Sequence, residues 1–338
     1  MTQPLLQISD LKIVFGVGEQ AAVAVRNVSF EIAAGEMVGL VGESGCGKSL
    51  TCRAAIRLLP HNARIAAGSV MFEGRDVTRM GHRELRNLRA REVGMIFQDP
   101  FTSLNPVFRV GAQVAETLRV NLELTAAQAK RETIRLFTEA GIPDAERWFA
   151  AFPHELSGGM RQRVMIALAL ASKPKLLIAD EPTTALDVTT QAQILKLLRR
   201  FREEHGVAVL LVSHDFGVIA ETCDRVLVMY GGHVVEKADI EAVYRTPQHP
   251  YTRALLASIP QMHTTGPRRR RKSIDGRPPE SGEVLPGCIF EPRCAYAREA
   301  CKSVDMKLEP AASNQYTACP FVRAGGEQRL EATVEGAQ

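Results

Sequence analysis

Residues 42–49 combine the residue types and the spacing that phosphate binding requires. Two glycines separated by four residues are followed at once by Lys48 and Ser49. Glycines let the backbone wrap closely around a polyphosphate, and a helix that begins near Lys48 would direct its N–H groups at the negative charge. Lys48 is then placed to reach the β- and γ-phosphates of a nucleotide, and Ser49 to bind Mg²⁺. The residues predicted to contact the nucleotide in this phosphate loop and just after it are Gly42, Glu43, Ser44, Gly45, Cys46, Gly47, Lys48, Ser49 and Thr51.

Two carboxylates stand at the end of a later apolar run. Asp180 and Glu181 follow residues 176–179, which have the composition of a buried strand. Asp180 would enter the ligand shell of Mg²⁺, and Glu181 would orient or deprotonate an attacking water as general base. The alternative is that the pair only ends a strand and caps the element after it. The upstream phosphate loop favours the catalytic interpretation.

Gln98 and His214 each follow a predicted buried strand, at 93–97 and 207–213. Ligands of open α/β sheets gather beyond the carboxyl ends of the strands. We therefore expect Gln98 to face the metal and the attacking water, and His214 to face the γ-phosphate. A single histidine is more often structural, but the matched placement of the two side chains strengthens both assignments.

Ser157, Gly158 and Gly159 form a second glycine-rich element, between the phosphate loop and the acidic pair. A helix is predicted over 157–172, so the N–H groups of its first residues can receive a γ-phosphate. A second phosphate-binding element in one chain suggests an ATP site that another subunit completes.

The elements that position these residues alternate between strand and helix. Strands are predicted within 5–41, and a helix begins near Lys48 and continues until Pro60 stops it. The pattern is helical from about 110 to 150.

Later in the chain, short apolar strands at 176–179 and 207–212 flank a helix at 189–204. Such alternation indicates a parallel sheet with helical crossovers, and therefore an α/β fold. Residues 226–236 are predicted to form a hairpin with its turn at Gly231 and Gly232.

The bulk composition excludes several classes of protein. The 338 residues are 45% hydrophobic and 24% charged, which is ordinary for a globular chain with one large domain and a smaller appendage. Arg268–Lys272 supplies five charges against a net charge of +4, so no distributed basic surface suggests nucleic acid. That run is interpreted as part of a solvated linker, with contact to lipid head groups or another subunit as the alternative. Without a secretory signal or an apolar stretch of roughly 18 residues, we expect a cytosolic or peripheral protein.

Four of the seven cysteines are gathered in the C-terminal tail. Without an export signal they are not expected to form a disulfide framework. Four thiolates can hold Zn²⁺ or an iron–sulfur cluster, although the closely spaced cysteine pairs usual in structural zinc sites are absent. A loose tail with four free thiols is the third alternative. The candidate ligands are Cys288, Cys294, Cys301 and Cys319.

The order of these elements, from the phosphate loop to His214, resembles the ATP-binding subunit of ABC transporters over about residues 5–245. The resemblance implies a P-loop NTPase (RecA-like) core with an antiparallel β subdomain and an α-helical ABC subdomain at about 100–160, within a nucleotide-binding domain at 1–260. It implies a head-to-tail dimer, with ATP between one subunit's phosphate loop and the other's Ser157, Gly158 and Gly159. Phe15 matches the aromatic residue that stacks on adenine, and Asp187, in the segment 184–187, is placed at the nucleotide.

Residues 97–106, 153–163 and 249–252 resemble the oligopeptide/dipeptide/nickel importer branch of that family. This resemblance implies ATP hydrolysis coupled to uptake of di- or oligopeptides or a related small solute, at the cytoplasmic face of the inner membrane. The segment after Gln98 would touch the membrane subunits. The implied partners are a second ATPase subunit, usually a paralogue, two membrane permease subunits and an extracytoplasmic binding protein.

The tail also resembles the C-terminal region of the oligopeptide/dipeptide ATPases, in which similar cysteines bind a [4Fe–4S] cluster. Residues 261–338 are therefore predicted to be a linker and a small Cys-rich extension that binds a [4Fe–4S] cluster, with Zn²⁺ as the alternative. A different class of function is a soluble ABC ATPase that acts on nucleic acid, ribosomes or Fe–S assembly. The single ATPase domain, the segment 101–106 and the lack of a basic face argue against that class.

Overall fold

The computed structural model describes residues 3–18, 21–99, 103–184, 186–258, 274–280, 282–283 and 285–322. Residues 100–102 of the predicted membrane-subunit contact, Ala185 and the Arg268–Lys272 run lie outside the described residues. The chain forms two compact units, and each is described by itself. Unit 1 comprises Met1–Leu6, Ile32–Met37 and Phe72–Val212, and unit 2 comprises Gln7–Glu31, Val38–Met71 and Ser213–Gln338.

A sheet with the strand order β11-β12-β10-β9-β3 organises unit 2. β3 (Met37–Val41) lies parallel to β9 (Arg225–Tyr230), and β9 forms an antiparallel hairpin with β10 (His233–Asp239). The turn of this hairpin is Gly231 and Gly232, with φ of 51° and 87°, angles that glycine adopts without strain. The predicted hairpin is confirmed.

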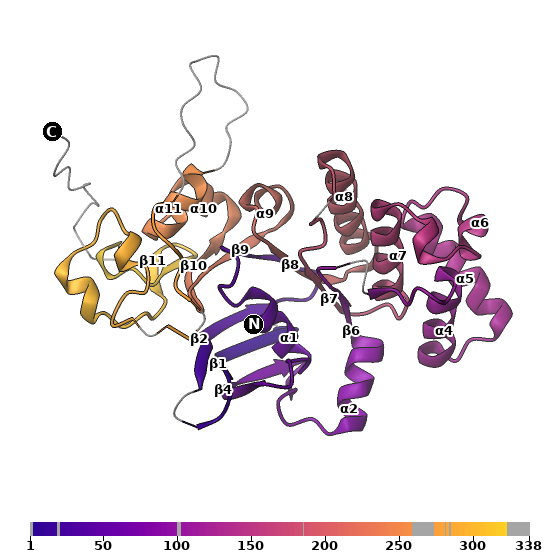
Figure 1. Ribbon diagram of the computed structural model, residues 1–338, viewed down its shortest axis with the longest axis horizontal. Coiled ribbons are helices and arrows are strands. Elements are labelled where there is room, and N and C mark those ends of the chain that lie inside the picture. The colour runs from indigo at the N-terminus through magenta and orange to yellow at the C-terminus, as the bar shows by residue number, and fades with distance from the viewer. Residues whose placement is uncertain are drawn as a thin grey trace, which may run out of the picture. The chain divides into compact units, whose positions relative to one another are not determined.

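Two short strands from the C-terminal tail extend the same sheet. β12 (Gln315–Thr317) pairs antiparallel with β10, with Thr317 opposite Glu236, and β11 (Glu309–Ala312) pairs with β12 (Figure 1). Beside these strands the tail forms three short 3₁₀ turns, at Glu291–Arg293, Glu299–Ser303 and Pro320–Val322. The tail is therefore hydrogen-bonded to β10 and forms the edge of the sheet on that side.

The remaining elements of unit 2 are three strands and four short helices among its described residues. The strands β1 (Leu6–Phe15), β2 (Ala22–Ile32) and β4 (Ala63–Phe72) are neighbours in the order β2-β1-β4. The helices are α1 (Lys48–Ala55), α9 (Phe216–Thr222), α10 (Ile240–Arg245) and α11 (Pro250–Ala257).

Three parallel strands lie side by side in unit 1. β6 (Val93–Ile96), β7 (Leu176–Asp180) and β8 (Ala208–Ser213) have the order β8-β7-β6, and every residue of β7 and β8 is buried. α8 (Val188–His205) connects β7 to β8, which confirms the predicted strand–helix–strand crossover. Unit 1 also contains the two-residue strand β5 (Arg75–Asp76), the helix α2 (His82–Asn87) and a π-helical turn at Leu88–Glu92.

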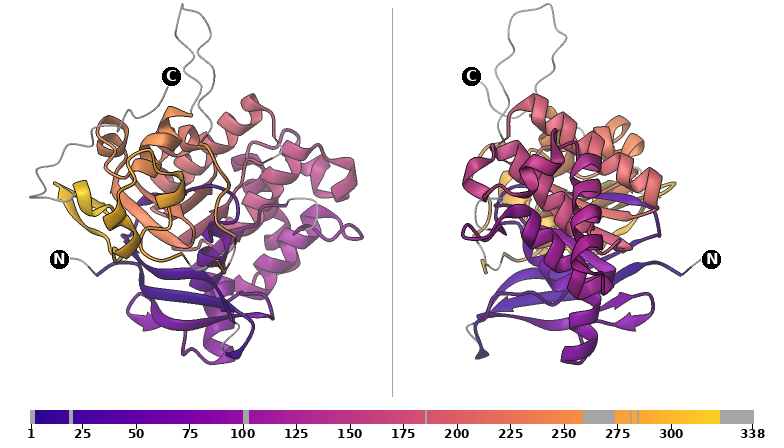
Figure 2. Two further views of the ribbon diagram at one scale, coloured as in Figure 1. Left: turned by 60° about the vertical axis from the view of Figure 1, so that its left-hand side comes forward. Right: turned by 90° about the vertical axis from the view of Figure 1, so that its right-hand side faces the viewer.

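Four helices of unit 1 pack against one another. They are α4 (Val110–Leu122), α5 (Ala126–Glu139), α6 (Ala145–Phe149) and α7 (Gly158–Leu170), coloured magenta in Figure 2. A 3₁₀ turn at Pro153–Glu155 leads from α6 towards α7. These helices occupy the region in which the sequence pattern predicts helix.

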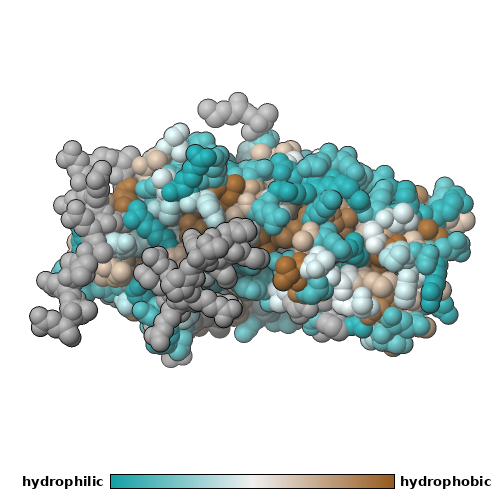
Figure 3. Space-filling view, turned by 90° about the horizontal axis from the view of Figure 1, so that it is seen from above, coloured by the Kyte–Doolittle hydropathy of each residue, from teal (hydrophilic) through white to brown (hydrophobic). Residues whose placement is uncertain are grey.

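Apolar residues on the face shown in Figure 3 occur as small groups between hydrophilic ones. No helix within the described ranges is both long enough and apolar enough to span a bilayer.

Candidate functional site

The phosphate loop connects β3 to α1, and its path requires glycine at several positions. Gly47, the N-terminal cap of α1, has φ of 102°, and Gly45 has φ of 82°. A Cβ atom on Gly42 would lie only 2.1 Å from the carbonyl oxygen of Met229. The loop therefore has the strand–loop–helix geometry in which a helix N-terminus meets a phosphate group.

Lys48 is turned into the phosphate loop. Its side chain belongs to a residue only 5% exposed, and Nζ donates hydrogen bonds to the carbonyl oxygens of Gly42 at 2.7 Å and Glu43 at 2.9 Å. A buried ammonium is stabilised best by an opposite charge, which two carbonyl groups do not supply. The arrangement therefore suits a polyphosphate as the missing counter-charge.

Thr51 lies beneath the loop in the first turns of α1. It is fully buried, and its hydroxyl donates a hydrogen bond to the carbonyl oxygen of Gly47 at 3.0 Å. This bond stabilises the turn between the loop and α1, and the contact of Thr51 with the nucleotide stays a prediction.

In unit 1, Gln98 and Glu181 come together although 83 residues separate them. Gln98 Nε2 donates to Glu181 Oε2 at 3.0 Å, and Thr184 Oγ1 donates to the same oxygen at 2.9 Å. Two donors fix the orientation of the carboxylate, which a general base requires. No role was predicted for Thr184 from the sequence. Its position, three residues after Glu181, was the one feature that could have indicated this contact.

The backbone at the acidic pair is unusual. Glu181 has φ of 48°, a left-handed conformation that is uncommon outside glycine, and its N–H donates to the carbonyl oxygen of Val212 at 3.1 Å. Asp180, the last residue of β7, is only 1% exposed. A carboxylate oxygen is a ligand that Mg²⁺ prefers, so the residue type at this strand end fits the metal.

Ser157 caps the N-terminus of α7. Its Oγ accepts a hydrogen bond from the Met160 N–H at 3.3 Å, and Gly158 and Gly159 are the first helical residues. Ser157 is exposed, so this helix terminus is accessible to another molecule. A Cβ atom on Gly159 would lie 2.8 Å from Cγ2 of Thr190, so glycine is also needed for the packing against α8.

Asp187 caps α8 in the same way. Its carboxylate accepts hydrogen bonds from the Thr190 N–H at 2.9 Å and the Thr190 hydroxyl at 2.7 Å. These bonds, the one from the hydroxyl first, lower the pKa of Asp187, so the cap is ionised at neutral pH.

The other two predicted site residues lie in unit 2 with the phosphate loop. Phe15 is the last residue of β1 and partly exposed, and His214 follows β8 and is exposed. Unit 1 contains the remaining ones: Gln98, Ser157, Gly158, Gly159, Asp180, Glu181 and Asp187.

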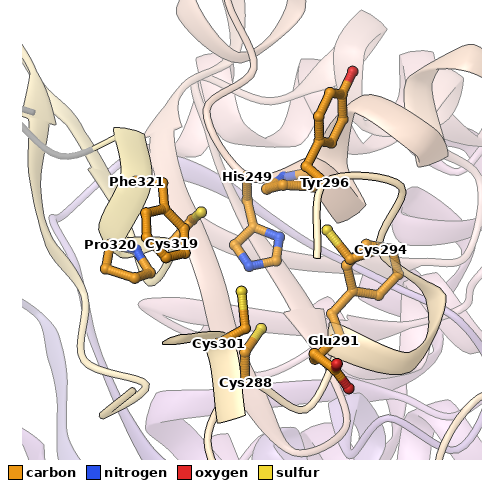
Figure 4. A pocket seen from close by; sticks show the side chains of 11 residues that line it. His249, Cys288, Glu291, Cys294, Tyr296, Cys301, Cys319, Pro320 and Phe321 are labelled. Atoms are coloured by element: carbon orange, nitrogen blue, oxygen red, sulfur yellow. The ribbon is translucent and has the colours of Figure 1, made fainter. Parts of the chain in front are cut away.

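The four tail cysteines line one pocket together with His249, and we call it the thiol pocket (Figure 4). Cys288 and Cys301 point towards the His249 ring, and the sulfur atoms of Cys294 and Cys319 face the same space from opposite sides. None of the four forms a disulfide. Burial raises the pKa of Cys288 to about 11 and that of Cys294 to about 12, so both thiols are protonated at neutral pH.

The predicted [4Fe–4S] or Zn²⁺ site at Cys288, Cys294, Cys301 and Cys319 is not supported as these thiols stand. Among the described residues, no three or more His, Cys, Asp and Glu side chains are placed to hold a metal ion together. His249 Nδ1 accepts a hydrogen bond from the Tyr251 N–H at 3.1 Å, whereas its buried Nε2 has no hydrogen-bond partner. Burial lowers the pKa of His249 to about 3, so the ring is neutral.

Two residues that the sequence analysis does not assign to a site contact the phosphate loop. The Tyr251 hydroxyl accepts a hydrogen bond from the Glu43 N–H at 3.0 Å, and Arg293 forms an ion pair with the Glu43 carboxylate at 2.7 Å. They lie 208 and 250 residues after Glu43, so no local pattern could connect them with the loop.

Comparisons with known proteins relate the chain to transport ATPases. The ABC transporter family matches residues 25–184, and the family described as oligopeptide/dipeptide transporter, C-terminal region, matches residues 235–301. The probable peptide ABC transporter ATP-binding protein y4tR of Sinorhizobium fredii is 45% identical over 93% of this chain and 94% of its own length.

Two further relatives are named for the solutes they transport. The oligopeptide transport ATP-binding protein OppD of Salmonella typhimurium is 45% identical, over 93% of both chains. The dipeptide transport ATP-binding protein DppD of Escherichia coli is 42% identical, over 94% of this chain and 96% of its own.

Solved structures show a similar fold. The dimeric ATP-binding cassette MJ0796, bound to ADP and phosphate, has a TM-score of 0.63 and 28% identity, and the match covers 70% of this chain and 98% of the cassette. CbiO1 of Clostridium perfringens, part of an ABC transporter complex, has a TM-score of 0.62 and 27% identity, over 72% and 92%. The chain therefore has the fold of an ABC ATPase cassette.

Proposed function

Because this chain belongs to the oligopeptide/dipeptide family of ABC transporter ATP-binding subunits, we propose that it is the ATP-hydrolysing motor of an importer of di- or oligopeptides or a related small solute. The names of its relatives in Salmonella and Escherichia support a peptide as the cargo. The family match at residues 235–301 favours this function over a soluble ABC ATPase acting on nucleic acid, ribosomes or Fe–S assembly.

The phosphate loop carries the proposal. Lys48 is buried inside the loop next to the N-terminus of α1, and its Nζ donates to the carbonyl oxygens of Gly42 and Glu43 and, at 3.8 Å, to the Cys46 sulfur, all of them uncharged partners. ATP would supply the anionic partner, with its β- and γ-phosphates along the loop. Phe15 would stack on the adenine, and His214 would face the γ-phosphate.

Hydrolysis would depend on Glu181, which is held by Gln98 and Thr184. Its carboxylate would orient or deprotonate the attacking water. Mg²⁺ would neutralise charge on the phosphates, with Ser49, Gln98 and Asp180 as its protein ligands. All three offer oxygen donors, which Mg²⁺ prefers.

The second phosphate-binding element supports a dimer. Ser157, Gly158 and Gly159 form an exposed helix N-terminus that would receive the γ-phosphate of an ATP held by the partner subunit, with Asp187 beside it. Each subunit would thus complete the other's site. ATP binding would close the dimer, and hydrolysis would open it.

Replacing Glu181 tests the catalytic part of this proposal. We expect Glu181→Gln to retain ATP binding, because the shape is unchanged, and to lose turnover by about 100-fold or more, because the general base is removed. Binding of a fluorescent ATP analogue and release of phosphate measure the two effects. Glu204→Gln is the control, since Glu204 is an exposed residue of α8 paired only with Arg200 in the described contacts. Wild-type turnover in Glu181→Gln would reject the assignment.

The proposed partners follow from the branch of the family. They are a second ATPase subunit, usually a paralogue, two membrane permease subunits and an extracytoplasmic binding protein, with the chain at the cytoplasmic face of the inner membrane. The segment after Gln98 would contact the permease subunits. Nucleic acid is not a proposed partner.

We further propose that the thiol pocket holds a [4Fe–4S] cluster, with Zn²⁺ as the alternative. The convergence of Cys288, Cys294, Cys301 and Cys319 on one space supports the proposal. Ligation requires the thiols to lose their protons and to move closer together than they stand here.

Metal analysis decides between these alternatives. In chain purified without oxygen, we expect about four irons and four sulfides per molecule, and loss of both in Cys288→Ser. Cys223→Ser serves as the control because Cys223 lies outside the thiol pocket. Zinc without iron would reject the cluster, and the absence of both would reject any metal in the pocket.

A further inference from the structure

Two side chains from the C-terminal half of the chain bind Glu43 of the phosphate loop. One contacts its backbone and the other its carboxylate. Its N–H donates to the Tyr251 hydroxyl at 3.0 Å. Its carboxylate accepts two parallel hydrogen bonds from Arg293, at 2.7 Å from Nη1 and 3.1 Å from Nη2. Such a bidentate pair fixes direction as well as distance.

Arg293 uses its whole hydrogen-bonding capacity to stay in this position. Besides the two bonds to Glu43, Nη1 donates to the Tyr230 hydroxyl at 3.1 Å, Nη2 to the carbonyl oxygen of Ile274 at 3.2 Å, and Nε to that of Asp275 at 2.8 Å. All five N–H donors of the guanidinium are therefore engaged. The side chain is only 4% exposed, and its partner carboxylate 25%.

The surroundings of Arg293 differ from those of its neighbour Arg277. Arg277, in the same part of the chain, pairs with Glu280 at 2.6 Å, but both side chains are exposed, at 66% and 79%. Exposed ion pairs contribute little to the stability of a fold, whereas a buried charge that loses its partner destabilises it strongly. Of these two ion pairs, the buried one between Arg293 and Glu43 is therefore the one that can determine the backbone geometry of the phosphate loop.

The residue whose carboxylate Arg293 binds also contacts Lys48 through its backbone. The Glu43 carbonyl oxygen accepts a hydrogen bond from Lys48 Nζ at 2.9 Å. A change in the position of Glu43 would therefore change both the curvature of the loop and the starting position of the lysine that reaches for phosphate.

We propose that Arg293 is a positioning residue of the phosphate loop, which sets the affinity for ATP through the Glu43 carboxylate without touching the nucleotide. The C-terminal tail thus forms part of the nucleotide site of its own chain. This inference rests on the proposed binding of ATP at residues 42–49.

The test compares full-length variants by titration with a fluorescent ATP analogue and by steady-state hydrolysis. In Arg293→Gln we expect Kd and KM for ATP to rise about tenfold, the equivalent of ~1.4 kcal/mol, with kcat changing much less. Arg293→Lys should lie between, because lysine keeps the charge and lacks the planar fork. Arg277→Gln is the matched control and should bind like the wild type.

Glu43→Gln completes a double-mutant cycle. We expect the double variant, Glu43→Gln with Arg293→Gln, to bind ATP no more weakly than Arg293→Gln alone, because both changes remove the same pair. Where Arg293→Gln does not fold, Glu43→Gln and Arg293→Lys provide the test. Unchanged Kd and KM in the folded variants, with only a lower melting temperature, would overturn the inference and leave Arg293 a structural role.

Lys48→Ala separates this inference from the proposed function. Loss of binding in Lys48→Ala together with unchanged affinity in the Arg293 variants would reject the positioning role alone. Wild-type binding in Lys48→Ala would instead show that the nucleotide lies elsewhere, and the proposed function would fail.

Discussion

Gly47 and Gly45 show how single residues determine the shape of the phosphate loop. Both have positive φ, yet their surroundings differ. A Cβ atom on Gly47 would lie 2.8 Å from Cε of Met229 and 3.1 Å from the carbonyl oxygen of Ala24. Within the described part of the chain, no heavy atom lies within 4 Å of a Cβ atom on Gly45, apart from its own neighbours.

We therefore expect unequal effects of two alanine substitutions. Gly45→Ala should lower the free energy of unfolding by about 1 kcal/mol, from backbone strain alone. Gly47→Ala adds contacts that force the loop to move, so it should cost about 2–3 kcal/mol and also weaken ATP binding. Urea unfolding and nucleotide titration measure both quantities. Equal losses in the two variants would contradict the role of these contacts.

Residues with local signatures were predictable, and residues that act over long separations were not. The glycines and Lys48 of the phosphate loop are contiguous, so their chemistry is visible in the spacing. Arg293 is an ordinary arginine in a tail that was interpreted through its cysteines, and only the fold brings it to Glu43. The thiol pocket lies between these cases: its four cysteines were predicted as ligands of one centre, and they line one pocket, although they do not stand at ligand distance from one another.

Among the elements, those with clear end signals match the sequence pattern well. The helix predicted at 189–204 is α8, which begins after its cap at Asp187 and ends before Gly206, whose φ is 66°. α1 differs, because it was expected to continue to Pro60 and ends at Ala55. Just after the end of α1, Arg57 has φ of 52°, and the Leu58 N–H donates a hydrogen bond to the carbonyl oxygen of Arg53 at 2.7 Å. That left-handed closure usually involves glycine, so the sequence carried no signal for it.

The strands β11 and β12 were not predicted from the sequence, in which the tail was interpreted as a linker and a small Cys-rich extension. Their pairing with β10 joins Thr317 to Glu236, residues far apart in the chain. A three-residue strand shows no reliable periodicity of its own, so only its partner defines it. These strands hold the tail to the sheet in which β3 leads into the phosphate loop.

At the scale of the whole molecule, the two elements that we propose to bind phosphate lie in different units. The phosphate loop belongs to unit 2, and the exposed N-terminus of α7 belongs to unit 1. In the proposed dimer, the phosphate loop of one subunit and the N-terminus of α7 of the other would contact the same ATP. Through Arg293, the tail would also adjust the affinity of the phosphate loop for ATP, whose binding is proposed to close the dimer.

Peptide uptake by membrane vesicles tests the motor function most directly. The vesicles would contain the chain with its permease subunits, partner ATPase and binding protein, and a radiolabelled dipeptide and pentapeptide would report transport. We expect ATP-dependent uptake of at least one peptide, with hydrolysis stimulated by the loaded binding protein, and loss of both activities in Lys48→Ala. Hydrolysis that is indifferent to the loaded binding protein, with no uptake in wild-type vesicles, would contradict a peptide importer.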